Sequence, residues 1–521
     1  MKQLIRTFRA GVLLLAVPLV ASLFMQAQAQ TSLTVQPQAQ LNGSTAPGGQ
    51  FAASVAIDGD TAVVGAPLDG QAGSAYVYAR SGTSWTLVQR LSPADGQSGD
   101  NFGFSVAIKG DTIIVGAPLR DTLGVNSGGA YAFSRTPAGW QQSQIMSAIR
   151  PAPGDQFGFS VSLSNSALII GAPQDDDLGE NAGTAYIWTR GTTAWENGPQ
   201  IFGGDTTRDD QFGTSVSMSA TTALVGAPQD DDAGNNSGSA YLFSLAADGG
   251  WPQAAKLVAD DASAGDVFGY SVSLDGNWAL IGAFFDDNPG ATNSGAAYLF
   301  QRGGTGWSQN QKLVANNAAA EDRAGYAVAL SGGLALVGAP FRDNNTAADV
   351  GALYIWARGA GGWTQQTPQF GVDARDFFAR SVSLSGYTML AGAPYDDPNG
   401  AQDAGTASLL IVPGTDGTLA FAPTPAVIGD PLTVTVNDAD LNTDASAAES
   451  ITVSVVSSDG ESETLTLEET GVDTGSFSAA VTTELGSSAG ANGDGAFVLG
   501  AGDSLTATYV DDHRANGGAA T

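Results

Sequence analysis

A unit that occurs seven times in this 521-residue chain limits which folds the chain can adopt. Each copy contains a Phe-Gly pair, a short alternating run, an apolar run ending in Gly-Ala-Pro, an acidic loop and an aromatic run. The glycine of Gly-Ala-Pro, or of its variant, stands at 65, 116, 171, 226, 282, 338 and 392, so successive copies are almost equally spaced. A nearly fixed period of this length predicts a solenoid or a propeller.

The runs within each unit are short, and none has helical spacing. In the third copy, residues 160–163 alternate, residues 167–170 are continuously apolar, and residues 185–188 are aromatic and β-branched. All three patterns are typical of strands. Polar turns such as Asp58-Gly59-Asp60 join the first two strands. Four strands per unit, repeated seven times, predict an all-β fold: a closed seven-bladed β-propeller.

The two ends of the repeat array indicate how the ring closes. A tryptophan opens the fourth strand of six copies, at 85, 140, 195, 251, 307 and 363, and the seventh copy ends without one. Residues 33–41 precede Phe51 as a fourth strand would, because Thr34 stands as far before Phe51 as Trp85 stands before Phe102. We therefore predict that the N-terminal strand completes blade seven and removes an open edge.

These motifs, Phe-Gly-x-Ser-Val followed by Val-Gly-Ala-Pro, resemble the FG-GAP repeat of the integrin α-subunit N-terminal propeller and its bacterial relatives. The resemblance covers residues 30–413 and implies a propeller used for extracellular recognition. The chain departs from the calcium-binding members, in which a long Asp-rich loop joins the first two strands; here that connection is a tight turn. Some copies are degenerate, with Phe284 in place of proline, Ala324 in place of phenylalanine and Ser408 in place of tyrosine.

Acidic residues concentrate in the loops after Gly-Ala-Pro and between blades. Because strands alternate in direction, both loop families should emerge on one face, which in relatives binds the ligand. Loops on a rigid scaffold commonly carry function. The predicted ligand-face residues are Asp175, Asp176, Asp177, Asp230, Asp231, Asp232, Asp286, Asp287, Asp396 and Asp397. Such loops could hold Ca²⁺ through oxygen ligands, or they could serve only to cap turns and keep the face soluble.

Residues 1–29 have the pattern of a secretory signal. Lys2, Arg6 and Arg9 precede an apolar core at 11–24 and a small-x-small cleavage site at 27–29. The core is too short to span a bilayer, and the mature chain contains no other candidate. We predict a secreted or cell-surface protein. Its net charge of −32 disfavours nucleic acid and favours cations or basic partners, although solubility alone would also explain it.

The repeat ends near residue 413, and residues 414–521 contain Thr/Val-rich alternating runs. These predict a whole or incomplete Ig-like β-sandwich, which resembles modules of large bacterial surface proteins. Asp438, Asp440, Asn442, Asp444 and Glu449 have the spacing of EF-hand ligands and could hold Ca²⁺. Thr443, where an EF-hand has glycine, and the flanking strands favour a solvated loop instead.

The sequence offers little for catalysis. His513 is the single histidine and lies in the C-terminal tail, and the chain has no cysteine, so we expect no catalytic residues. We predict a non-enzymatic binding or adhesion protein that recognises an extracellular protein or glycan, as a monomer or as part of a larger surface protein. A structural stalk component and a carboxylate-dependent glycan hydrolase or lyase are the alternatives.

Overall fold

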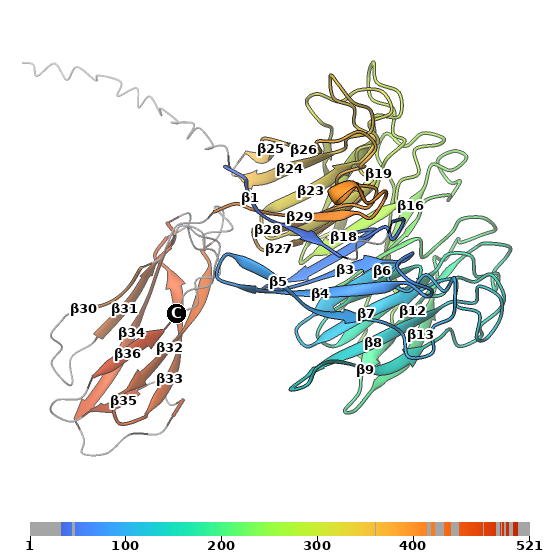
Figure 1. Ribbon diagram of the computed structural model, residues 1–521. Helices are drawn as coiled ribbons and strands as arrows, with labels where there is room; N and C mark the ends of the chain where they lie inside the picture. The colour runs from blue at the N-terminus through green and yellow to red at the C-terminus, as the bar shows by residue number, and fades with distance from the viewer. Residues whose placement is uncertain are drawn as a thin grey trace, which may run out of the picture. The chain divides into compact units, whose positions relative to one another are not determined.

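The computed structural model describes residues 33–43, 47–359, 361–413, 418–422, 432–438, 448–471, 474–485, 490, 492–493, 496–499 and 504–508. Residues 33–413 form seven antiparallel sheets of a β-propeller (Figure 1). Among the described residues, the single helical element is the short 3₁₀ turn η1 (Pro398–Gly400). The prediction of an all-β, seven-bladed propeller is therefore confirmed.

Each blade is built from four strands in sequence order, except that blade seven takes its fourth strand from the N-terminus. Blades one and two are β2 (Ser54–Asp58), β3 (Thr61–Ala66), β4 (Ser74–Ser81), β5 (Ser84–Leu91) and β6 (Ser105–Lys109), β7 (Thr112–Ala117), β8 (Gly129–Thr136), β9 (Gly139–Met146). Blades three and four are β10 (Ser160–Leu163), β11 (Ala167–Ala172), β12 (Thr184–Arg190), β13 (Trp195–Ile201) and β14 (Ser215–Met218), β15 (Thr222–Ala227), β16 (Ser239–Ser244), β17 (Gln253–Leu257). Blades five and six are β18 (Ser271–Asp275), β19 (Trp278–Ala283), β20 (Ala296–Gly303), β21 (Gly306–Leu313) and β22 (Ala327–Ser331), β23 (Leu334–Ala339), β24 (Ala352–Gly359), β25 (Gly362–Gln365), with the short β26 (Gln369–Phe370) also on β24. Blade seven is β27 (Ser381–Ser385), β28 (Thr388–Ala393), β29 (Thr406–Ile411) and β1 (Gln36–Asn42).

The N-terminal strand closes the ring, as the spacing before Phe51 predicts. β1 pairs antiparallel with β29 (Figure 1). Gln40 lies opposite Ser408 and Leu41 opposite Ala407. Blade seven also contacts blade one directly, because the Ser381 hydroxyl donates a hydrogen bond to the carbonyl oxygen of Ala52 at 2.8 Å. β29 therefore has a partner strand along its full length, and the ring has no open edge at this point.

The hydrophobic core is divided into clusters between neighbouring blades. The second strand of every blade is buried along almost its whole length, because both of its faces pack on neighbouring sheets. The cluster between blades seven and one includes Leu41, Leu390 and Leu409 with Val64 and Tyr76. Closure thus buries apolar surface in the same way as each of the other blade junctions.

The repeated Phe-Gly, Ser and Gly-Ala-Pro residues meet at the blade junctions, which explains why they recur. Phe102 is fully buried, and its ring meets Tyr131 edge-on at 5.3 Å between centroids. Six first-strand serines donate hydrogen bonds of 2.8–2.9 Å to a carbonyl oxygen at the start of the next blade. A Cβ atom on any of the seven motif glycines would lie 1.8–2.3 Å from the carbonyl oxygen at this place in the next blade, so the junction has room only for glycine.

The C-terminal strands form a separate sheet with its own core. Its order is β30 (Thr418–Ala422), β31 (Leu432–Asn437), β34 (Ser476–Leu485), β33 (Ser462–Glu469), β32 (Ser450–Ser457) and β36 (Leu505–Thr508), with β35 (Ala496–Leu499) parallel to β34. Alternate side chains such as Val434, Val453 and Phe477 are buried in one cluster. The predicted strands are present, and the Ig-like assignment stays a prediction. No helix in the described part of the chain is long and apolar enough to cross a membrane.

Candidate functional site: the acidic loop face

The loops between second and third strands and the loops between blades lie on one face, as the strand alternation predicts. A backbone bridge links Gly183, just before β12, to Phe212 at the start of blade four. The same kind of bridge occurs at the other blade pairs. The first joins Gly73 to Phe102, between blades one and two, and the last joins Gly351 to Phe378, between blades six and seven. Further along the same two loops, the Asp209 N–H donates to the Glu180 carbonyl oxygen at 2.9 Å. The two loop families therefore form one continuous surface, which we call the acidic loop face.

The ten predicted ligand-face carboxylates fall into two groups. Asp175, Asp230 and Asp286 are buried, with 2–3% of their surface exposed, and Asp396 is half-buried. The remaining six are exposed: Asp176, Asp177, Asp231, Asp232, Asp287 and Asp397. The exposed group can meet a ligand directly, whereas the buried group is engaged inside the protein.

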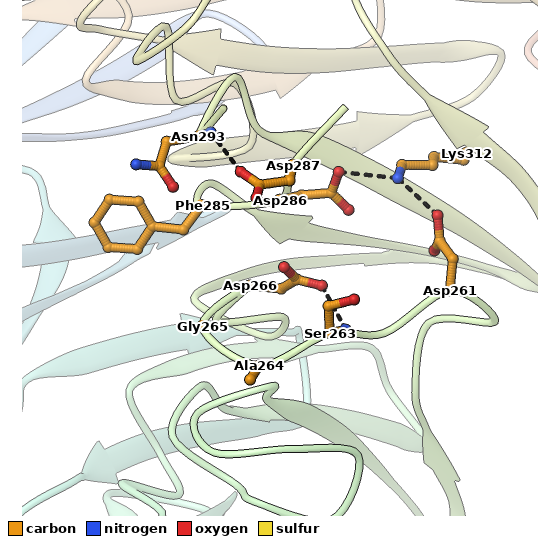
Figure 2. Close-up of a pocket in the computed structure, with 10 residues that line it drawn as sticks. All are labelled: Asp261, Ser263, Ala264, Gly265, Asp266, Phe285, Asp286, Asp287, Asn293 and Lys312. Atoms are coloured by element: carbon orange, nitrogen blue, oxygen red, sulfur yellow. Dashed lines mark hydrogen bonds and ion pairs between the residues drawn. The ribbon is translucent and has the colours of Figure 1, made fainter. Parts of the chain in front are cut away.

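The buried aspartates belong to a Tyr–Asp–cation cluster, seen most completely in blade five. The Tyr298 hydroxyl lies within hydrogen-bond distance of the carboxylates of Asp286 and, at 2.9 Å, of Asp261. Lys312 forms ion pairs with Asp261 at 2.7 Å and with Asp286 at 2.9 Å (Figure 2). Burial alone would lower the pKa of Lys312, but the hydrogen bonds to these two carboxylates raise it above its usual range. Asp261, Asp286 and Lys312 line a pocket of about 160 Å³, and the lysine is a fixed positive charge in it.

Three other blades contain a version of this cluster. Blade four repeats it with Tyr241 and Lys256, whose ammonium pairs with Asp205 at 2.8 Å and with Asp230 at 3.0 Å. Blades one and two use arginine, in the pairs Arg90–Asp69 at 2.9 Å and Arg120–Asp95 at 2.6 Å. Blade six pairs Arg342 with Asp322 at 3.1 Å, but its Tyr354 hydroxyl makes no hydrogen bond to a carboxylate of the described residues. Blades one, two, four and five thus each supply an internal cation to the carboxylates of the cluster.

A second recurrent carboxylate, just before the repeat's first position, is also buried. Asp155, Asp210, Asp266 and Asp376 hold this place at the start of blades three, four, five and seven. Burial, aided by neighbouring carboxylates, raises the pKa of each to about 6. In Figure 2, Asp266 accepts a hydrogen bond from the Ser263 N–H at 2.7 Å. These four groups are partly protonated just below neutral pH.

These raised pKa values predict that stability increases on mild acidification. An acid whose pKa is higher in the folded than in the unfolded chain binds its proton preferentially in the folded state. Stability should therefore rise as the pH falls from about 7 toward 4, and be lost again as the pH rises through 6. We expect the melting temperature measured by circular dichroism to be a few degrees higher at pH 5 than at pH 7.5.

The control for this prediction replaces the four groups with asparagine, as D155N/D210N/D266N/D376N. This variant should show a smaller difference between the two pH values, because the acids that titrate in this window are gone. The aspartates whose pKa is lowered, such as Asp95, Asp205 and Asp261, titrate below this window and remain as wild type. A melting temperature that falls steadily from pH 7.5 to pH 5 in the wild type would contradict the prediction.

An aromatic strip on the same face was not predicted from the sequence. The rings of Tyr270 and Tyr326 lie 5.1 Å apart, those of Phe341 and Phe377 5.1 Å, and those of Phe377 and Tyr395 5.3 Å. All five side chains are half-buried. They come from the segment that leads into each first strand and from the residue after Gly-Ala-Pro. Aromatic residues at these two places of the repeat are the sequence feature from which the strip could have been predicted.

Two arginines are stacked into this strip. The Arg323 guanidinium lies 4.3 Å from the Phe341 ring centroid, and Arg380 lies 5.1 Å from that of Tyr326. A guanidinium over an aromatic face is held by the ring quadrupole. The acidic loop face therefore combines exposed carboxylates with a fixed patch of aromatic and positively charged groups across blades five to seven.

The predicted EF-hand-like run lies mostly outside the described residues. Asp440, Asn442 and Asp444 are not among them. Asp438 is buried and donates its backbone N–H to the Gly475 carbonyl oxygen at 2.8 Å. Glu449 donates its backbone N–H to Glu469 at 3.2 Å. A calcium site in this loop stays a prediction.

A closed ring of seven repeat-built blades with one loop-rich face defines the general class, a β-propeller. The FG-GAP repeat family matches residues 43–78, 85–133, 140–188, 195–243, 251–300, 307–356 and 371–410, which is more than half of the chain. This chain belongs to the FG-GAP repeat family. A comparison with curated proteins finds no match. Among solved structures, a chain in a crystal structure of a mitotic checkpoint complex is similar, with 13% identity and a TM-score of 0.45, over 77% of this chain and 98% of that chain.

Proposed function

We propose that this chain is an exported, non-enzymatic binding or adhesion protein that recognises an extracellular ligand through the acidic loop face. The observation that carries the proposal is the arrangement of this face: six exposed aspartates next to loops anchored by buried Tyr–Asp–cation clusters. Loops fixed in this way lose little conformational entropy when a partner binds. FG-GAP propellers are typically non-enzymatic, which agrees with a binding or structural role.

The charge of the face suggests the chemistry of the ligand. Exposed carboxylates raise the local concentration of cationic groups and speed their association. The aromatic strip with Arg323 and Arg380 supplies aromatic and positively charged groups at the same face. A protein with basic side chains would use the exposed carboxylates, and a glycan would use mainly the strip. The signal at residues 1–29 is the basis for proposing export, and the C-terminal strands are proposed to form an Ig-like spacer.

The test compares two variants that lose equal charge on opposite faces. D176N/D231N/D287N removes three exposed carboxylates from the acidic loop face while keeping an acceptor for the loop N–H groups of Asn181, Asn236 and Asn293. D60N/D111N/D248N removes three exposed carboxylates from the turns at the opposite ends of the strands. Wild type and variants are applied to arrays of extracellular matrix proteins and polysaccharides.

We expect the first variant to lose at least tenfold in affinity for the captured ligand and the second to bind as wild type, with binding weakened by salt. Equal losses in the two variants would contradict recognition by the acidic loop face. Absence of any specific ligand would favour the structural stalk component. Release of sugar products from the polysaccharides would instead identify a carboxylate-dependent glycan enzyme.

A further inference from the structure

Blade seven departs from the Tyr–Asp–cation cluster at two positions at once. In blades one, four and five the fourth-strand residue opposite the cluster tyrosine is Arg90, Lys256 or Lys312. In blade seven the fourth strand is β1, and the corresponding pair is Gln40 opposite Ser408. Both the cation and the tyrosine are therefore replaced by small or neutral side chains.

The carboxylates of the cluster are nevertheless retained in blade seven. Asp396 stands four residues after the motif glycine Gly392, as Asp286 does after Gly282 in blade five, and Asp376 corresponds to Asp266. Asp373 adds a third acid. One carboxylate oxygen from each of the three lies within 4.8 Å of the others. Blade five places an ammonium among its carboxylates, whereas blade seven has three carboxylates converging on the same kind of place without one.

The most buried of these acids has no side-chain partner. Asp376 is 8% exposed; the backbone N–H of Asp373 approaches its carboxylate, and among the described residues no side chain donates a hydrogen bond to it or forms an ion pair with it. Asp396 accepts a hydrogen bond from the Thr406 hydroxyl. Across the described residues, no lysine or arginine pairs with any of the three carboxylates. Burial, together with the negative charges of Asp396 and Asp373, raises the pKa of Asp376 to about 6.

The space next to these carboxylates is large enough for an ion and its water ligands. The cavity has a volume of about 740 Å³ and is lined by Asp373, Asp376, Asp396, Asp397, Thr406 and Ser408 among others. Ser408, which stands at the position of the cluster tyrosine, also lines this space. These side chains offer carboxylate and hydroxyl oxygens, and the chain has no cysteine. Hard divalent cations prefer such ligands, and Ca²⁺ accepts six to eight oxygens in flexible geometry.

We propose that blade seven binds a divalent metal ion, Ca²⁺ in preference to Mg²⁺, through Asp373, Asp376 and Asp396. The ion takes the place of the lysine ammonium that blades four and five hold against Asp230 and Asp286, the equivalents of Asp396. Water and the Ser408 and Thr406 hydroxyls are available to complete its coordination. The site is distinct from the EF-hand-like run in the C-terminal part, and it does not depend on the proposed ligand of the acidic loop face.

The experiment is calorimetric titration of the full chain with CaCl₂, and separately with MgCl₂ at the same ionic strength, for wild type and three variants. D376N removes the buried ligand. D266N makes the same substitution in blade five, where Lys312 is present. Q40K places an ammonium opposite Ser408, at the register of Lys256 and Lys312.

We expect D376N to weaken Ca²⁺ binding at least tenfold, D266N to bind as wild type, and Q40K to lose this site. In the absence of Ca²⁺, Q40K should melt at a higher temperature than wild type. This result would show that the lysine ammonium occupies the site and that Q40K does not lose Ca²⁺ binding through misfolding. The proposal is overturned if wild type binds no Ca²⁺ at millimolar concentration, or if D376N and Q40K bind as wild type. Equal losses in D266N and D376N would also overturn it, because they would indicate general charge screening.

Discussion

Deleting residues 33–43 should lower the melting temperature of the propeller by roughly 10 °C or more. The deletion removes β1, exposes the backbone groups of β29 along its length and uncovers Leu390 and Leu409, which pack with Leu41. Losing one buried leucine and the strand hydrogen bonds costs on the order of 5 kcal/mol. The measurement is thermal unfolding followed by circular dichroism, together with the soluble yield, since an open strand edge promotes aggregation.

A permuted chain is the control for this deletion. Gln36 pairs with Ile411, so the beginning of β1 lies opposite the end of β29. Placing residues 33–43 after residue 413 through a short Gly/Ser linker should restore the strand in the same register as an ordinary hairpin. Recovery of the wild-type melting temperature is expected. If the deletion variant itself melted as wild type, β1 would not be the strand that stabilises the closed ring.

The Gly226→Ala substitution should destabilise the propeller by on the order of 3 kcal/mol. The added Cβ would lie 1.8 Å from the Gly269 carbonyl oxygen and 2.5 Å from the Ser215 hydroxyl oxygen. Backbone at a blade junction cannot move aside without breaking the hydrogen bond from Ser215 to Gly269. Chemical denaturation monitored by tryptophan fluorescence gives the change in the free energy of unfolding.

Gly304→Ala is the matched control for this junction glycine. No atom lies within 4 Å of a Cβ built at Gly304, and its backbone is outside the left-handed region. The control should change the free energy of unfolding by less than about 0.5 kcal/mol. Equal effects of the two substitutions would indicate that glycine flexibility, rather than contact between blades, accounts for the Gly-Ala-Pro motif.

The fold could be predicted from the sequence because repetition makes local signals reinforce one another. The distance from Thr34 to Phe51, equal to that from Trp85 to Phe102, was enough to assign the closing strand, although β1 begins at Gln36 rather than at 33. The face shared by the two loop families followed from strand alternation alone. Local spacing and strand direction were sufficient for these conclusions, since neither depends on side-chain contacts.

The roles of individual carboxylates could not be predicted in the same way. Asp175, Asp176 and Asp177 are identical residues in sequence, yet the first is buried against the Tyr186 hydroxyl at 2.9 Å and the other two are exposed. The difference depends on a tyrosine in the following strand and, in several other blades, on a lysine or arginine one strand further along. The absent cation of blade seven likewise becomes visible only when Gln40 is placed opposite Ser408.

Hydrogen exchange of the full chain with and without its captured ligand tests the central claim most directly, because it locates the binding surface without mutation. Recognition by the acidic loop face predicts protection in the loops that contain Asp176, Asp231, Asp287 and Asp397, with little change at the turns near Asp60, Asp111 and Asp248. Protection confined to those turns, or to the C-terminal strands β30–β36, would contradict the proposed use of this face.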